Sequence, residues 1–289
     1  MDTDLSVHAP LTFSLAERDR RWSAIRALMS EAGIDVLVAT GNTGRYNHHT
    51  ADARYVTHIG GPDVEVHAVL PLEGAVTAIA RGKSPWVSDV RPKFNRHEAD
   101  GIVERLQELQ ADGKRIAVAG LEGLIRSPQG IVDYAVMKRL LEHFPRATFV
   151  NGTDLMYRVR AVKSEEEVAF IRQAVRIAEA AVRRLVAESR PDVKDCAVYA
   201  HMVAAEIEAG GELPFMLAWH ATQAGTPYRR LTQATPDRAM RSGDLIYCQI
   251  EGKWQGYCSQ MDQTVVLGTM PDQVRRMAGA QLEAFEAAV

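Results

Sequence analysis

Apolar residues recur along the first half of the chain with two alternating periods. Ser14 and Glu17 have the spacing of a capping box, and the apolar stripe after them predicts a helix that ends at Gly33. Short β-branched runs bounded by Gly, Pro and polar residues predict strands at residues 34–40, 64–72, 74–80, 114–120 and 147–153. Helical periods predict helices at residues 101–113 and 130–145. This alternation is typical of an α/β domain whose helices cover a sheet.

The second half has longer helical periods and a different order of elements. Ser164 and Glu167 form a second capping box, and the stripe after them predicts one long helix that ends before Pro191. Asp192 is placed to cap a following helix that ends at Gly210 and Gly211. A hairpin with arms at residues 245–250 and 256–267 and a turn at Gly252 is expected next, and then a helix that opens near Pro271.

The change of pattern predicts two domains. We expect an α/β domain over residues 1–155 and an α+β domain over residues 156–289. A chain of 289 residues that is 46% hydrophobic can bury two domain-sized cores.

Charge and composition narrow the classes of function. The net charge of −3 is spread along the chain, so nucleic acid is not expected as a partner. No apolar run approaches the roughly 20 residues that span a bilayer, and the N-terminal residues lack a signal-peptide pattern, so we expect a cytoplasmic protein without membrane contact. Cys196, Cys248 and Cys258 have no metal-type spacing and fit a reducing compartment; Cys248 and Cys258 lie on the two hairpin arms, but a disulfide is not expected.

Three motifs carry a resemblance to a known family. They are "YRVRAVKSEEEVAFIRQA", "RSGDLIYCQIEG" and "GYCSQMDQTVVLG". The chain resembles the creatinase, prolidase and aminopeptidase P family over nearly its whole length. The resemblance implies a creatinase-type α/β domain at the N-terminus, followed by the first half of a pita-bread catalytic domain. It also implies that the second half of that domain, with a histidine and two glutamates, is missing from a chain truncated at its C-terminus.

The resemblance also locates two metal positions. In the metallopeptidase members an aspartate lies seven residues before the glycine of a Gly-Tyr pair and another lies four residues after it. Here those positions are Gln249 and Gln260. A glutamine amide brings no negative charge to a metal pair, so no metal cofactor is expected. Glu251 and Asp262 repeat the same separation two positions later and leave a shifted metal site as an alternative.

Creatinase lacks the metal aspartates, and the resemblance to it suggests site residues. Its glutamate that contacts the cationic end of the substrate matches Asp262. Its proton-shuttling histidine matches Thr232 in a gapless count, or Tyr228 or Arg229 if the loop has an insertion, while His220 is the nearest imidazole. We expect His220, Tyr228 and Asp262 as catalytic residues, and Arg229, Gln249, Glu251 and Gln260 as substrate-binding residues. For Gln249 and Gln260 a structural hydrogen-bonding role remains equally open, and Glu251 is expected to be solvated at the turn edge.

These residues favour a hydrolase acting on a C–N bond, amide or amidine in type, of a small cationic or zwitterionic metabolite. Two alternatives remain open: a catalytically inactive pita-bread module that binds a peptide or partner protein, and an Xaa-Pro metallopeptidase with a shifted metal site. The substrate, the activity itself and the residue that replaces the histidine are not fixed by the sequence. In relatives an N-terminal loop covers the partner subunit's pocket. The loop "GRYNHHTADARYVTHIGG", with His48, His49 and His58, therefore predicts a homodimer, and a surface loop is favoured over metal binding.

Overall fold

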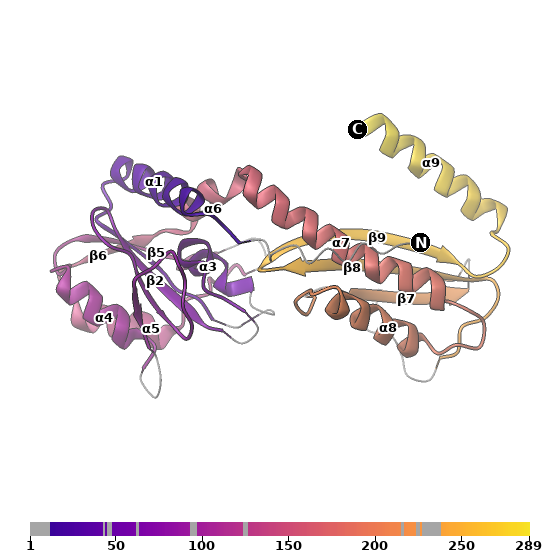
Figure 1. Ribbon diagram of the computed structural model, residues 1–289, viewed down its shortest axis with the longest axis horizontal. Helices are drawn as coiled ribbons and strands as arrows, with labels where there is room; N and C mark the ends of the chain where they lie inside the picture. The colour runs from indigo at the N-terminus through magenta and orange to yellow at the C-terminus, as the bar shows by residue number, and fades with distance from the viewer. Residues whose placement is uncertain are drawn as a thin grey trace. The chain divides into compact units, whose positions relative to one another are not determined.

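A computed structural model describes residues 12–42, 44, 48–61, 64–92, 97–123, 127–214, 217–223, 226 and 238–289. The chain separates into two compact units, Met1–Phe170 and Ile171–Val289 (Figure 1). The boundary at residue 155 that the sequence suggests stays a prediction. Each unit has its own sheet and its own core.

The first unit is built on a mixed six-stranded sheet in the order β4-β3-β2-β1-β5-β6. Strand β1 pairs antiparallel with β2 and parallel with β5, and β5 pairs parallel with β6. The predicted strands are present, and β4 is an addition that sequence reasoning missed. The strands are β1 (Val36–Ala39), β2 (Val66–Pro71), β3 (Thr77–Ala80), β4 (Asp89–Arg91), β5 (Arg115–Ala119) and β6 (Thr148–Asn151).

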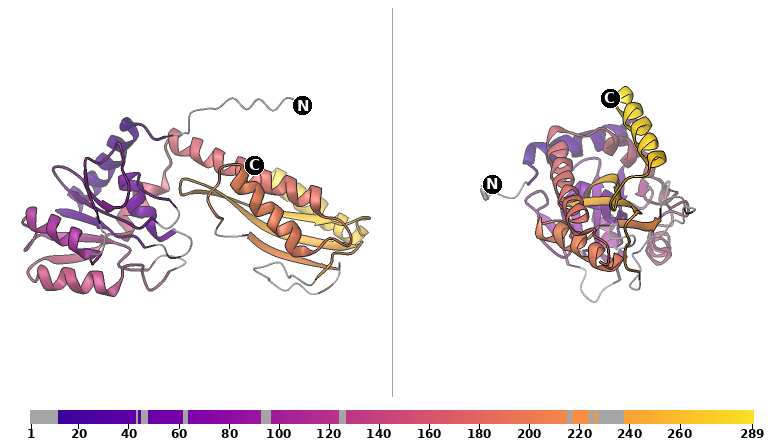
Figure 2. Two further views of the ribbon diagram at one scale, coloured as in Figure 1. Left: turned by 60° about the horizontal axis from the view of Figure 1, so that its bottom comes forward. Right: turned by 90° about the vertical axis from the view of Figure 1, so that its right-hand side faces the viewer.

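Helices cover both faces of this sheet (Figures 1 and 2). Valines and isoleucines of β1 and β5 form one core with helices α4 (Ala99–Glu108) and α5 (Tyr134–His143). The other face is covered by α1 (Leu15–Glu31), α3 (Ala51–Thr57) and α6 (Thr153–Ala161), and a 3-10 turn, η1 (His48–Thr50), precedes α3. Strands β1 and β5 form a parallel pair that is buried on both faces, and such strands consist of continuous apolar residues. This explains the short β-branched runs in the sequence.

The start of α7 (Glu165–Glu188) is tied to α1 by a buried charge network. Arg21 is 1% exposed; its guanidinium donates to Glu17 at 2.7 Å and lies 4.1 Å from the ring centroids of Phe13 and Tyr55. Burial alone would raise the pKa of Glu17, but hydrogen bonds from Arg20 and Arg21 lower it. Paired and stacked in this way, the buried ions avoid the large cost of isolated charges.

Of the two predicted capping boxes, one is complete and the other is modified. Ser164 accepts the amide of Glu167 at 3.2 Å, and Glu167 accepts the amide of Ser164 at 2.9 Å. Ser14 caps α1 as predicted, but its own amide donates to Glu166 because Glu17 is engaged by the arginines. Long-range pairing therefore overrides the local motif.

The second unit is a three-stranded antiparallel sheet in the order β7-β8-β9, with helices on one face (Figure 1). Most of α7 and all of α8 (Asp195–Glu208) pack on it, while α9 (Asp272–Ala288) has no buried residue. The strands are β7 (Leu217–Gln223), β8 (Asp244–Trp254) and β9 (Tyr257–Val266).

Two sequence predictions for this unit are wrong. The hairpin turn is at Gln255 and Gly256, both with positive φ (45° and 83°), and Gly252 lies inside β8. A Cβ on Gly252 would lie 2.1 Å from the carbonyl oxygen of Ala174, so this glycine serves a close approach to α7. Asp192 does not cap α8; it has a left-handed backbone (φ 68°), and Lys194 is the N-cap residue.

None of the helices in the described residues has the length and apolar character needed to cross a membrane.

A buried carboxyl group lies on α8. Glu206 is 0% exposed, and neither of its carboxyl oxygens has a hydrogen-bond partner among the described residues. Burial, and then the nearby charge of Glu251, raises the pKa of Glu206 to about 8. The folded protein therefore holds this group protonated at neutral pH.

This burial predicts a pH-dependent stability. The unfolded state releases the Glu206 proton near its ordinary pKa of 4.5, so the free energy of unfolding falls as pH rises from there toward about 8. Glu206→Gln should remove this loss and stabilise the protein by a few kcal/mol at about pH 8.5 but little at about pH 5, because each tenfold difference in proton affinity corresponds to roughly 1.4 kcal/mol. Urea unfolding at the two pH values measures it. The control is Glu208→Gln, on the exposed side of the same helix; equal effects of the two variants would contradict the assignment.

Candidate functional site

The sheet of the second unit has one apolar and one polar face. Residues Ile246, Cys248 and Ile250 of β8 point to the helices and are fully buried. Residues at the alternate positions lie on the opposite face together with their cross-strand partners, because side chains along a strand alternate. The candidate site residues His220, Gln249, Glu251, Gln260 and Asp262 all lie on this polar face.

Four of these residues form a two-by-two block. Gln249 is paired with Asp262, and Glu251 with Gln260, so each amide lies opposite a carboxyl group. Directly opposed side chains have Cβ atoms about 5 Å apart, within reach of a hydrogen bond from amide to carboxylate. The block therefore presents two acids and two neutral amides.

Exposure differs within the block. Asp262 and Gln260 are exposed, Gln249 is intermediate and Glu251 is only 4% exposed. The expectation that Glu251 is solvated at the turn edge is wrong, because β8 continues beyond it to Trp254 and the turn lies further on. Burial, and then the charge of Glu251, raises the pKa of the Cys258 thiol to about 12.

His220 lies in the next row of the polar face. It is paired with Tyr247, which is paired in turn with Thr264. His220 is 7% exposed, and burial lowers its pKa, as does the charge of Arg238, while Asp195 acts in the opposite direction. The ring is therefore neutral at pH 7 and can accept a proton.

An ion-pair cluster lies beside this row. Arg238 donates to Asp195 at 3.2 Å and to Asp244 at 2.5 Å, and both carboxylates are almost fully buried. Asp244 also accepts the amide of Arg241 at 2.8 Å, which fixes the approach to β8. The Gly-Asp motif thus anchors the strand that carries Tyr247 and Gln249. The cluster adjoins a hollow that is lined by Thr222, Gln223, Thr226, Arg238, Arg241 and Asp244.

Sequence reasoning missed Tyr247 and Arg238. Tyr247 could have been found, because it is two positions before Gln249 on the same strand. The role of Arg238 depends on Asp195, 43 positions away, and has no local signal. The predicted Tyr228 and Arg229 lie outside the described residues, as does Thr232.

The expected histidine loop is a 3-10 turn followed by a helix. His58 ends α3 with φ 54° and packs edge-on against Phe13 at 5.2 Å; burial lowers its pKa to about 4. It therefore serves packing. His49 hydrogen-bonds within the first unit to Asn42 and Ser127.

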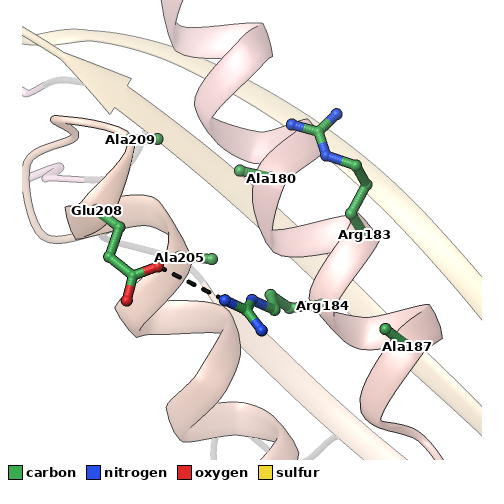
Figure 3. A pocket seen from close by; sticks show the side chains of 7 residues that line it. All are labelled: Ala180, Arg183, Arg184, Ala187, Ala205, Glu208 and Ala209. Atoms are coloured by element: carbon green, nitrogen blue, oxygen red, sulfur yellow. Dashed lines mark ion pairs between the residues drawn. The ribbon is translucent and has the colours of Figure 1, made fainter. Parts of the chain in front are cut away.

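Another concave region lies between α7 and α8 (Figure 3). Alanines line it, and the ion pair of Arg184 with Glu208 crosses it at 3.7 Å. An exposed pair of this kind contributes little binding or stability. Its lining is Ala180, Arg183, Arg184, Ala187, Ala205, Glu208 and Ala209, and none of these residues belongs to the polar face.

The chain is similar to known hydrolases and peptidases. Residues 169–289 match the model of "Metallopeptidase family M24". An uncharacterized hydrolase/peptidase of Sinorhizobium fredii is 26% identical over 98% of this chain and 74% of its own length, and an ectoine hydrolase of Halomonas elongata is 26% identical over 97% and 73%. The solved Xaa-Pro dipeptidase from Bacillus anthracis superposes with a TM-score of 0.72 at 17% identity, over 92% of this chain and 70% of that one.

The fold is therefore the pita-bread fold of a hydrolase class that includes prolidases and Xaa-Pro dipeptidases. Residues 169–289 therefore resemble metallopeptidase family M24, and the resemblance to the creatinase, prolidase and aminopeptidase P family is confirmed.

The donor set of this chain does not fit the metal pair that the family name implies. The two positions that the resemblance matches to metal ligands carry the neutral amides of Gln249 and Gln260. Within the described ranges, no group of three or more His, Cys, Asp or Glu side chains could hold a metal ion. A divalent ion pair needs carboxylates to balance its charge.

The charge cluster makes a testable prediction for His220. We expect NMR titration to give His220 a pKa below 6.5. In Arg238→Gln the pKa should rise, because a lowering charge is lost while Asp195 stays. Arg241→Gln, which changes an exposed neighbour, is the control. An unchanged His220 titration in Arg238→Gln would show that burial alone sets the pKa.

Proposed function

We propose that this protein is an M24-type hydrolase that cleaves a C–N bond, amide or amidine in type, of a small cationic or zwitterionic metabolite without a metal pair. The observation that carries the proposal is the cross-strand block of Gln249, Asp262, Glu251 and Gln260. The sequence resemblance matches Gln249 and Gln260 of this block to the metal aspartates of the family. Two carboxylates opposed by amides can bind a cationic group, but they offer a poor cage for two divalent ions.

The geometry suggests how the polar face divides the work. His220 and Asp262 are on strands separated by β8 and are offset by two residues, so their backbones are roughly 12 Å apart. They do not need to touch, because a small substrate can contact both. Asp262 would bind the cationic end of the substrate. Neutral His220 would accept a proton from a water molecule while the oxygen of that water attacks the carbon of the C–N bond. The C–N bond then breaks, and the leaving amine receives that proton.

Two relatives support this substrate class. The Halomonas elongata protein is named as a hydrolase of ectoine, which is a small molecule, and the Bacillus anthracis structure as a dipeptidase. Both names indicate short substrates. A cytoplasmic location also belongs to this proposal, and the three cysteines in their thiol form fit it.

A substrate panel tests the function. The protein is incubated with cyclic amidines, guanidino acids and Xaa-Pro dipeptides, with and without a chelator, and amine release is followed. We expect turnover of a non-peptide compound that survives chelation. Asp262→Asn should raise KM about 10- to 100-fold with a smaller change in kcat, because a charge-assisted contact is lost. Asp272→Asn, exposed in α9, is the matched control.

Two other results of the substrate panel would favour the alternative functions. Metal-dependent cleavage of Xaa-Pro dipeptides would favour a shifted metal site at Glu251 and Asp262. Binding of a peptide or partner protein without turnover of any compound would favour an inactive module.

We also propose a homodimer, as the resemblance implies. The N-terminal domain would cover the partner's pocket and exclude water from a site with no metal to organise it. An obligate interface of this type buries on the order of 2,000 Å² or more. Light scattering at micromolar concentration should give twice the mass of the chain, 31.9 kDa. A stable monomer with native helix content would contradict the shared pocket.

A further inference from the structure

A relay of hydrogen-bonded polar side chains lies within the first unit, whereas the polar face belongs to the second unit. The Ser127 Oγ is 3.3 Å from Nε2 of His49, and the Nδ1 of the same ring is 3.0 Å from Oδ1 of Asn42. A hydroxyl, an imidazole and an orienting carbonyl in this order are the parts of a nucleophile, a base and its support.

The hydrogen bonds around Asn42 determine the direction of the relay. Its Nδ2 donates to the carbonyl of Ile131 at 2.8 Å, and its Oδ1 accepts the amide of Gly44 at 2.9 Å. These two partners assign the amide orientation, so the atom that faces His49 is an acceptor. Nδ1 of His49 therefore carries the proton, and Nε2 has the lone pair that can accept the hydroxyl hydrogen of Ser127.

Close backbone packing holds these groups in place. A Cβ on Gly44 would lie 2.7 Å from both Oδ1 of Asn42 and Nδ1 of His49, so the chain passes directly over the pair. On the other side, the amide of Gly130 donates to the carbonyl of Ser127 at 2.9 Å and closes a tight turn. Gly130 has φ 78°, and a Cβ there would meet the carbonyl oxygens that follow β5. The relay is preorganised by these contacts.

The relay lies where open α/β sheets bind ligands. Asn42 and His49 follow the carboxyl end of β1, and Ser127 follows the carboxyl end of the adjacent parallel strand β5. The chain continues from β1 to β2 on one side and from β5 to β6 on the other, so the connections diverge at this point. In open α/β sheets, ligands bind at the carboxyl edge where the connections diverge in this way. This argument from fold supports the argument from geometry.

We propose that Ser127 is a nucleophile for small activated acyl compounds, with His49 as its base and Asn42 as the positioning residue. The Ser127 oxygen attacks the acyl carbon while its proton moves to Nε2 of His49. The bond from that carbon to the leaving oxygen breaks, and the leaving group takes the proton from Nε2. Water then hydrolyses the acyl-serine by the same route. Ser127 is only 2% exposed, which favours a small acyl group.

Acetylation by p-nitrophenyl acetate tests this site. In the full chain we expect a burst of nitrophenol of up to one equivalent and an acetyl group on Ser127 in peptide mass spectra. Ser127→Ala should abolish both signals. His49→Gln keeps a hydrogen-bonding side chain but cannot take the proton, so acylation should slow at least about 100-fold.

Two controls separate reactivity from folding. Ser189→Ala removes another buried serine, and His143→Gln removes an exposed histidine; both should leave the burst unchanged. Circular dichroism and melting curves confirm that each variant is folded. The proposal is overturned if the folded native chain is not acetylated at Ser127, or if His49→Gln reacts as fast as the native chain. None of these variants changes a residue of the polar face of the second unit. The result is therefore independent of the function proposed for that face.

Discussion

The close approach of β8 to α7 at Gly252 is the constraint on which the second unit depends. Any side chain there would collide with the backbone of Ala174 and Ala178. Together with the tight turn at Gln255 and Gly256, this contact fixes which residues of the hairpin face the helices. A slip by one position would turn the polar rows toward the core and the buried Cys248 toward solvent. Which residues of the hairpin form the polar face therefore depends on a backbone contact on the opposite face of the sheet.

The sequence predicts most of the elements but few of the contacts. Helices and strands of the first unit follow from periodicity, because an α/β core needs apolar stripes of known spacing. The local sequence predicts a turn at Gly252, because a glycine flanked by polar residues is typical of a turn. A glycine that lets a strand pack closely against a helix has the same local sequence, so the two cases cannot be told apart. The burial of Glu251 and the pairing of Asp195 with Arg238 depend on segments distant in sequence. The block of Gln249 and Asp262 was within reach, since alternation places both on one face.

Buried ionisable groups of two kinds occur among the described residues. In the first unit the buried Arg21 is surrounded by aromatic rings and paired with carboxylates, so its charges are balanced. In the second unit Glu206 is buried without a hydrogen-bond partner among the described residues, and Glu251 adds a second acid nearby. A buried carboxyl group with a raised pKa costs stability at high pH, and groups with perturbed pKa values are concentrated at sites that bind or react. Glu251 belongs to the polar face and raises the pKa of Glu206 in the core, so the electrostatics of the core and of the candidate site are coupled.

The position of Asp262 on β9 has a consequence for association between chains. In the described part of the sheet, β7 and β9 are the outer strands, and an outer strand can template pairing with a strand from another molecule. Exposed polar residues at Gln260, Asp262 and Thr264 interrupt the apolar positions along β9. A charged side chain in the middle of an outer strand is a common protection against aggregation. The acid proposed to bind substrate therefore also helps to keep the sheet from adding a foreign strand, so an apolar residue at this position would endanger solubility as well as binding.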